Sequence, residues 1–483
     1  MSKQFRRSKN RWPSYADVWR WHFYAGVFCI PFVLILSITG TIYLFRPQLE
    51  AWSQREMDSL AKFDGKASYA QQVIAAQEAT GGWLASLEVI SEPARLAGFE
   101  SATRIITEAD NQRLRSFVHP ATAEVLETQN EDDGFIRAAK KIHGELLLGK
   151  KGSYMVETAA SWTMVMVITG IVLWTPRRMR FAGVIYPRLS RSGKVFWRDL
   201  HAVFGFWCSG LILFLIATGL PWSTFWGDYF KQIRRWTGTS VATQSWDGGH
   251  SAQGHSHTPD SPAKKPKGPS WRSAAIDPSH YQLNEIDAVA NFAKSLQWLP
   301  PVEVSPPTDR TSVWKIQSTT ANRPFRQSLF YDASLGQVTS AETFADKHWV
   351  DRLVGNGIAL HEGQRFVGTR FGWLNQLLAL FATACLMLLS CTGFVLWWRR
   401  RPKHERLSLN LHSPKRPSSS EGLVISKLRT AILLGAIGVL AVYLPLFGLT
   451  LATVLGGDFL ISKTRLVRYL PFYLVTPTIE ADE

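Results

Sequence analysis

The sequence predicts a helical membrane protein: an α-helical bundle of four core spans in two parallel repeats, a fifth span, and two small exterior α+β domains. Two observations predict this fold class. Five apolar runs are long enough to cross the hydrocarbon core, which takes about 20 residues. A histidine followed by an apolar helix and a Thr-Gly pair occurs twice, at His22 to Gly40 and at His201 to Gly219. A long polar segment and another apolar run follow each copy, which is typical of a duplicated unit.

The predicted spans carry many of their tryptophan and tyrosine residues at the ends, as membrane proteins do at the lipid–water interface. The spans cover residues 21–45, 154–175, 199–222, 373–398 and 430–456. A basic segment precedes the first span and no small-residue cleavage site follows it, so we interpret this span as an uncleaved signal anchor. Pro445 and Gly448 predict a kink or two half-helices in the fifth span.

The net charge of +16 is concentrated in three short segments beside the spans, 1–20, 176–198 and 399–429. The positive-inside rule predicts that these segments, and with them the N-terminus, are cytoplasmic. This distribution favours a membrane protein over a nucleic-acid-binding one. The long segments 46–153 and 223–372 are then exterior. The tail, 457–483, is exterior if the fifth span crosses once, although its own basic residues favour the other side.

The two exterior segments share an order of elements, with a helix at 68–80 or 286–297 followed by strand-like runs. The strand-turn-strand elements FVHPATAEV and FYDASLGQV correspond to one another, and Asp332 stands where the first has His119. We therefore expect each segment to form a small domain with a helix packed on an antiparallel sheet. We interpret His119 as a structural turn residue.

Topology sorts four histidines into two pairs. His22 and His201 begin outward-going spans, near the cytoplasmic face, whereas His143 and His361 precede inward-going spans, near the exterior face. A pseudo-two-fold axis along the membrane normal would bring each pair together inside the bundle. An intramembrane histidine is costly without a partner, so we expect two ligand sites stacked across the membrane.

Other histidines are interpreted differently. His348 is the main rival to His361, but the sequence around His361 matches that around His143 more closely. The stretch 248–270 is rich in Gly, Ser, Pro and His and is predicted to be a disordered insertion. Its histidines are interpreted as part of a solvated loop, with loose metal binding as the alternative; they are His250, His255 and His257.

Two neutral imidazoles in an apolar bundle favour haem over zinc. Zinc takes four protein ligands, or three and a water molecule. Two axial imidazoles instead complete the coordination of a haem, whose macrocycle fills apolar space between helices. The chain has no CxxCH motif, so the sequence predicts two haem b groups with the four histidines as axial ligands to iron. Bis-histidine coordination favours electron transfer over oxygen activation.

Basic and small residues near the histidines suit the same cofactor. Candidate partners of the haem propionates are Arg20, Arg198, Lys141 and Arg365. The alternative for them is an ordinary interface charge. Six glycines would let a macrocycle approach the helices, with plain helix packing as the alternative for each. They are Gly26, Gly40, Gly170, Gly205, Gly219 and Gly393.

Several segments together resemble the PepSY-associated transmembrane family. They are WRWHFYAGVF, VHPATAEVL, IHGELLLG, TGIVLWTPRR, WRDLHAVFGFW, YDASLGQV, LHEGQRFVG and TGFVLWWRRRP, and the resemblance extends to about residue 403. It implies two periplasmic PepSY domains on a four-helix core and a multi-pass protein of the bacterial inner membrane. Some relatives are ferric-siderophore reductases with two b-type haems, which implies that the four histidines are the ligands. The chain departs from the family at His119, in the insertion and in the fifth span.

The resulting functional hypothesis is a transmembrane electron conduit and ferric-siderophore reductase. Electrons would pass from the haem of His22 and His201 to that of His143 and His361, and then to a ferric siderophore. Hard oxygen ligands hold Fe(II) less tightly than Fe(III), so reduction would release iron for uptake. The chain has no convincing dinucleotide-binding or phosphate-binding motif. The donor is therefore expected to be a separate cytoplasmic reductase or a quinol.

Two alternatives lack redox activity. The PepSY domains could bind a peptide or a partner protein while the spans act as an anchor, which leaves the repeated histidines unexplained. The chain could instead transport the siderophore, but the first four spans hold almost no proton-coupling residues besides the histidines. Bound haem distinguishes the first hypothesis from both alternatives.

Overall fold

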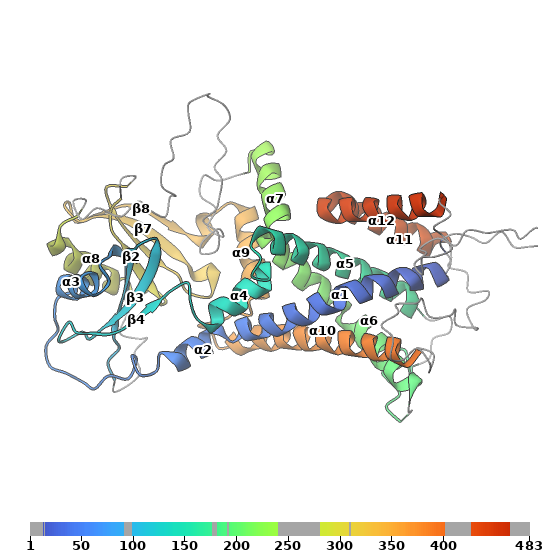
Figure 1. Cartoon of the computed structure of the whole chain (residues 1–483). Coiled ribbons are helices and arrows are strands. Elements are labelled where there is room, and N and C mark those ends of the chain that lie inside the picture. Colours follow the sequence, from blue (N-terminus) through green and yellow to red (C-terminus); the bar gives the residue numbers. More distant parts are fainter. Residues whose placement is uncertain are drawn as a thin grey trace, which may run out of the picture. The chain divides into compact units, whose positions relative to one another are not determined.

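A computed structural model describes residues 13, 15–90, 99–175, 181–190, 193–239, 281–308, 311–400 and 427–463. The predicted insertion 248–270 lies outside these residues, as do most of 1–20, most of 399–429 and the end of the tail. The chain divides into two compact units (Figure 1). The bundle unit comprises Met1–Thr41, Lys140–Ile233 and Leu380–Glu483, and the sheet unit comprises Ile42–Ala139 and Arg234–Ala379.

Four helices in the described part of the chain are long and apolar enough to cross a membrane. They are α1 (Tyr15–Leu44), α5 (Lys150–Trp174), α6 (Lys194–Gly219) and α10 (Gly372–Arg400). They confirm the first four predicted spans, and the chain is a multi-pass membrane protein. Helices α1, α5 and α6 begin four to six residues earlier than their predicted spans, because polar first turns at the interface are helical as well.

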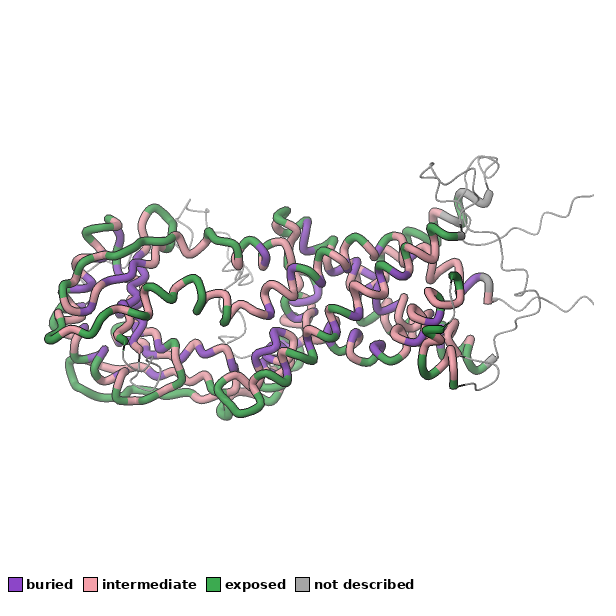
Figure 2. The backbone as a smooth tube through the Cα atoms, turned by 90° about the horizontal axis from the view of Figure 1, so that it is seen from below, coloured by how far each residue is buried: buried purple, intermediate pink, exposed green. Residues whose placement is uncertain are grey.

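Side-chain contacts give the directions of the bundle helices. The Tyr15 hydroxyl donates to the carbonyl of Leu173 at 3.5 Å, and Cys29 lies against the carbonyl of Ala159 at 3.6 Å. The beginning of α1 therefore lies beside the end of α5, and the two helices are antiparallel. Many residues of the bundle are only partly buried (Figure 2). Large apolar side chains such as Phe381 are exposed. An exposed apolar surface of this kind suits contact with lipid.

Helices α6 and α10 are likewise antiparallel. Cys208 contacts Cys385, and one turn earlier on α6 the Cα of Gly205 faces Leu389. Later residues of α6 therefore contact earlier residues of α10, as in an antiparallel pair. Three cysteines, Cys29 and the facing pair, are buried and pack as small apolar residues, whereas Cys391 is exposed.

The predicted fifth span is broken at Pro445, as its sequence indicates. It forms α11 (Lys427–Tyr443) and α12 (Pro445–Lys463), which are bent by 120° and both pack against α5. Proline has no backbone N–H and clashes with the preceding turn, so it ends the first helix. The break leaves a carbonyl at Tyr443 that receives a hydrogen bond from the Trp226 indole at 3.1 Å.

A carboxylate in α5 caps the helix that follows α6. Glu157 is 1% exposed, and its Oε2 accepts from the backbone N–H groups of Phe225 and Trp226 at 3.2 and 3.1 Å. These groups belong to the first turn of α7 (Thr224–Trp236), where N–H groups have no partner within the helix. The carboxylate therefore links α5 to α7.

We predict that Glu157→Ala lowers the stability of the bundle by about 1–3 kcal/mol, because two buried N–H groups lose their acceptor. Glu157→Gln keeps a side-chain carbonyl and should lose less than half as much. Thr158→Ala is the matched control, since its hydroxyl bonds only within α5. Thermal unfolding in detergent measures all three, and an unchanged midpoint for Glu157→Ala would contradict the capping role.

The sheet unit contains one antiparallel sheet of eight strands in the order β4-β3-β2-β1-β5-β6-β7-β8. The strands of the first half are β1 (Trp83–Val89), β2 (Thr103–Ala109), β3 (Gln112–Val118) and β4 (Val125–Asn130). Those of the second half are β5 (Val302–Ser305), β6 (Trp314–Ser318), β7 (Gln327–Asp332) and β8 (Gln337–Thr343). Helices α3 (Tyr69–Thr80) and α8 (Leu283–Ser295) lie side by side on one face (Figure 1).

The sequence predicts two separate exterior domains, whereas the structure joins their strands. Leu87 pairs with Val304 and Val89 with Val302 across β1 and β5, and all four side chains are buried. Each half alone would expose an apolar edge strand, and the pairing covers both edges. The two helices are joined as well, because the Asp287 carboxylate of α8 accepts from the first N–H groups of α3.

The two corresponding turns are built alike. The Asp332 carboxylate accepts from the N–H groups of Ser334 and Leu335 at 2.9 and 3.1 Å. Nδ1 of His119 accepts from Ala121 and Thr122 at 3.2 and 3.4 Å. The imidazole therefore replaces a carboxylate in the same turn, as the interpretation of His119 expects.

The remaining helices connect these elements. They are α2 (Arg46–Ser53), α4 (Phe135–Glu145), α9 (Trp349–His361) and three short 3₁₀ turns, Leu220–Trp222, Arg323–Phe325 and Phe344–Asp346. α4 carries His143 and α9 ends on His361, so neither of these histidines lies on a membrane-spanning helix. The other two, His22 and His201, lie in the second turns of α1 and α6.

Candidate functional site

His22 is held by the helix that runs antiparallel to its own. Its Nδ1 lies 3.1 Å from the carbonyl oxygen of Met166 and 3.0 Å from the hydroxyl of Thr169, both on α5. A carbonyl can only accept, so Nδ1 is the protonated nitrogen. The Thr169 hydroxyl donates its own proton to the carbonyl of Val165 at 2.8 Å, which leaves its lone pairs for the imidazole. Nε2 of His22 therefore keeps a lone pair that can bind a metal.

The same arrangement recurs at His201. Its Nδ1 lies 3.0 Å from the hydroxyl of Thr392 on α10. That hydroxyl donates to the carbonyl of Leu388 at 2.7 Å and therefore accepts from the imidazole. In the neutral ring, Nε2 of His201 is therefore again the nitrogen that carries no proton. This hydrogen bond from the distal nitrogen is the usual support of a metal-bound histidine.

His143 repeats the arrangement at the other end of α1. Its Nδ1 lies 3.0 Å from the carbonyl of Leu36 and 3.2 Å from the hydroxyl of Thr39. The Thr39 hydroxyl donates to Ile35 at 2.7 Å. Three of the four predicted histidines thus share one environment, in which a threonine and usually the carbonyl three residues before it fix the ring.

A glycine follows each of these threonines and lies against the imidazole. A Cβ at Gly40 would stand 3.0 Å from Cε1 of His143, one at Gly170 would stand 3.2 Å from Cε1 of His22, and one at Gly393 would stand 3.5 Å from Cε1 of His201. The glycines therefore make room for histidine rings, whereas the sequence interpretation assigned that room to a macrocycle. Gly26 and Gly205 face ordinary side chains at 3.6 and 3.5 Å, as in plain helix packing.

His22 and His201 face each other, as predicted. Their ring centroids are 6.3 Å apart and the ring planes are nearly perpendicular, at 82°. Two imidazoles on opposite sides of one metal, with bonds of about 2 Å and centroids about 1 Å behind each nitrogen, would have centroids roughly 6 Å apart. The spacing therefore fits two axial ligands of a single ion.

The donor set fits haem better than a metal held by protein alone. Among the described residues, no group of three His, Cys, Asp or Glu side chains is placed to hold a metal ion. A pair of imidazoles whose Nδ1 atoms carry the proton instead matches the two nitrogen ligands that haem iron takes in a bis-histidine site. The residues present thus fit the predicted cofactor at His22 and His201.

His143 lies far from this pair along the bundle. It contacts Thr39, 17 residues after His22 on α1, which corresponds to roughly 25 Å at 1.5 Å per residue. This distance is most of a hydrocarbon core of about 30 Å. His361 belongs to the sheet unit, so its pairing with His143 stays a prediction. His348, the rival of His361, caps α9 by accepting from the N–H of Val350 at 3.3 Å.

The predicted propionate partners differ in their surroundings. Arg20 is 15% exposed, lies 3.8 Å from Asp17, and has one buried guanidinium nitrogen without a hydrogen-bond partner. Arg198 is 54% exposed and is bound to the buried Asp199 at 2.6 Å. Arg365 donates to the Asn356 side chain at 2.7 Å. The Arg20 nitrogen without a hydrogen bond, Nη1, is the one that lies nearest the Asp17 carboxylate, so a propionate would share it with Asp17.

The sequence comparison agrees with this architecture. The family model of the PepSY-associated TM region matches residues 19–400. The chain belongs to this family. The match begins just before His22, ends after Gly393, and includes all four histidines of the predicted sites. No curated protein sequence matched the chain in a similarity search.

Sequence reasoning missed the threonines that hold the histidine rings. It used the Thr-Gly pairs to recognise the repeat but gave no role to Thr39, Thr169 and Thr392. A signal for that role existed, because a Thr-Gly pair stands inside every one of the first four spans. The partners were not predictable from spacing, since each threonine lies on a different helix from its histidine.

Proposed function

We propose that the chain is a di-haem transmembrane electron-transfer protein that reduces a periplasmic ferric siderophore. The single observation that best supports this proposal is the neighbouring pair His22 and His201, whose ring centroids are 6.3 Å apart and whose Nδ1 atoms each donate to a threonine. In the proposal, His22 and His201 would hold one haem b, and His143 and His361 would hold the other. Bound haem b supplies reversible one-electron transfer.

The chain's own residues prepare these ligands. Thr169, Thr392 and Thr39 fix the tautomer and the orientation of three imidazoles, so no ring must reorganise when iron changes charge. In the proposal a propionate accepts from Nη1 of Arg20, which makes no hydrogen bond and lies 3.8 Å from the Asp17 carboxylate.

The siderophore, the donor and the sidedness rest on the family and on charge placement. The basic segments predict that His22 and His201 lie near the cytoplasm, where a separate reductase or a membrane quinol would donate. The acceptor would then meet the site of His143 and His361. The proposal also places the protein in the bacterial inner membrane.

The activity is tested with purified protein that has been reduced and freed of excess reductant. Mixing it with a ferric hydroxamate or ferric catecholate siderophore should reoxidise the protein, and a ferrous chelator should trap about one Fe(II) per electron lost. A gallium siderophore has the same shape but accepts no electron, so it is the control. A reduced protein that stays reduced with every ferric siderophore would overturn the reductase proposal.

The three ligand-facing glycines give a graded prediction. Alanine at position 40 or 170 brings a Cβ within 3.0 or 3.2 Å of an imidazole, whereas alanine at 393 meets an ordinary contact of 3.5 Å. We expect Gly40→Ala and Gly170→Ala to lose bound haem, and Gly393→Ala and the control Gly26→Ala to keep it. The haem-to-protein absorbance ratio measures this order, and equal loss in all four variants would contradict it.

Removal of the threonine hydroxyl should change the redox potential. The Thr169 hydroxyl accepts from Nδ1 of His22 and makes the ring a stronger donor to iron, which favours Fe(III). Thr169→Val should therefore raise the midpoint potential of one haem, by roughly 20–60 mV if the hydrogen bond contributes about 0.5–1.5 kcal/mol. Thr169→Ser should restore it. A potentiometric titration that finds Val and Ser variants alike would contradict this role.

A further inference from the structure

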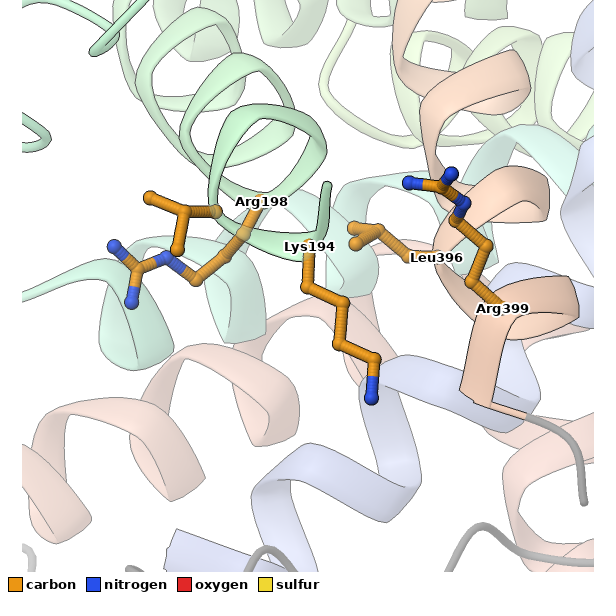
Figure 3. Close-up of a pocket in the computed structure, with 5 residues that line it drawn as sticks. Lys194, Arg198, Leu396 and Arg399 are labelled. Atoms are coloured by element: carbon orange, nitrogen blue, oxygen red, sulfur yellow. The ribbon is translucent and has the colours of Figure 1, made fainter. Parts of the chain in front are cut away.

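A basic cavity lies where α6 begins and α10 ends. Its volume is about 130 Å³, and it is lined by Lys194, Val195, Arg198, Leu396 and Arg399. Figure 3 shows Lys194 and Arg198 coming from α6 and Leu396 and Arg399 from α10. The lining therefore combines three cations with two apolar side chains, which suits a ligand that is anionic on one side and apolar on the other.

The charge of the cavity is only partly compensated. The buried Asp199 accepts hydrogen bonds from both Arg188 and Arg198, at 2.6 Å to the nearest nitrogen of each, so one carboxylate serves two guanidinium groups. Lys194 and Arg399 make no ion pair within the described part of the chain. The three lining cations and Arg188 together carry four positive charges, and Asp199 carries one negative charge. A net charge of three therefore remains in and beside the cavity.

The backbone adds donors at the same place. Helix α6 begins after Gly193, whose lack of a side chain leaves the first turn without a side-chain cap. Lys194 and Val195 are the first two residues of that turn and also line the cavity. Uncapped N–H groups and the positive end of a 26-residue helix favour an anion there.

The position of the cavity near the ends of two spans indicates which kind of anion it binds. Trp197 follows the basic turn of α6, and Trp397 and Trp398 immediately precede Arg399 on α10. Tryptophans at the ends of spans lie among lipid headgroups. Basic pockets between spans at that level bind the phosphate groups of anionic lipids.

We propose that this cavity binds the phosphate of an anionic phospholipid, with Lys194, Arg198 and Arg399 as its donors. Val195 and Leu396 contact the first carbons of the lipid. The proposal rests on the basic cavity and not on bound haem, although Arg198 is also a candidate partner of a haem propionate.

The test is native mass spectrometry of the detergent-purified full chain with added phosphatidylglycerol. Each basic residue near an anionic lipid contributes about fivefold, so Lys194→Gln/Arg399→Gln should weaken phosphatidylglycerol binding about 30-fold. The control variant Lys150→Gln/Lys151→Gln removes two cations from the first turn of α5 and should bind as the unaltered protein does. Lys194→Arg/Arg399→Lys keeps the charge and should retain binding, which separates loss of charge from misfolding.

Three results would overturn the proposal. Equal binding by the Lys194→Gln/Arg399→Gln and unaltered proteins would show that the cavity is not the lipid site. Displacement of the lipid by millimolar inorganic phosphate would assign the cavity to a free anion. Loss of haem from the same variant, with its melting temperature unchanged, would assign it to a cofactor carboxylate. Phosphatidylcholine should bind equally weakly to every variant.

Discussion

His201→Ala should reduce the haem b content of the purified protein from about two to about one per chain. The variant removes one of two facing imidazoles whose centroids are 6.3 Å apart, and alanine offers iron no ligand. His22 alone would hold a haem weakly, so we expect that haem to be lost during purification. A pyridine haemochrome assay counts the loss, and the remaining spectrum should be that of the His143 and His361 site.

The control for this variant is His348→Ala. His348 is the residue just before α9, and its Nδ1 caps that helix by accepting from the N–H of Val350. The control should keep both haems. A His201→Ala protein that keeps two low-spin haems would contradict the assignment of His201, whatever the control shows.

Asp351→Ala should destabilise the sheet unit by about 3–5 kcal/mol, the cost of leaving a buried charge unpaired. Arg234 is 2% exposed and Asp351 5%, and two hydrogen bonds of 2.6 and 3.0 Å join them. The alanine variant strands the guanidinium in the interior. Thermal or denaturant unfolding in detergent measures the loss.

Two further variants separate this cause from general damage. Asp228→Ala removes a carboxylate that is 76% exposed and lies 4.0 Å from Lys231, so it should cost less than about 1 kcal/mol. The double variant Arg234→Met/Asp351→Leu removes both charges and should recover most of the stability. A double variant no more stable than Asp351→Ala would contradict the account of a stranded charge.

The spans were predictable because hydropathy is a local property. A run of twenty apolar residues forms either a membrane span or a buried helix. The basic segments and the tryptophans beside these runs favour membrane spans. The break at Pro445 was predictable for the same reason, since proline acts on its own turn. The position of α12 against α5 was not, because contacts such as that of Trp162 with Thr450 join residues far apart in the chain.

The sheet shows where local reasoning fails. The turns at His119 and Asp332 are contained in short sequence motifs and were predicted. The pairing of Leu87 with Val304 joins strands separated by more than two hundred residues. Nothing in the sequence of either strand indicates which strand it pairs with. The two segments that were predicted as separate domains therefore share one sheet in the structure.

The site was predicted in part for a comparable reason. His22 and His201 were paired because the repeat and the alternation of spans place them at the same end of the bundle. The threonine that holds each ring could not be assigned, because it lies on another helix. Hydropathy predicts where that helix stands in the chain but not which of its faces meets the histidine. Arg198 was placed beside a propionate on charge alone, and the carboxylate that binds it, Asp199, is its neighbour in the sequence.

The measurement that tests the central claim most directly is a pyridine haemochrome assay with a reduced-minus-oxidised spectrum on the unaltered, detergent-purified protein. The electron-transfer proposal predicts about two b-type haems per chain, low-spin in both oxidation states. A colourless protein that stays without haem after reconstitution would contradict it and leave the family's binding or transport alternatives.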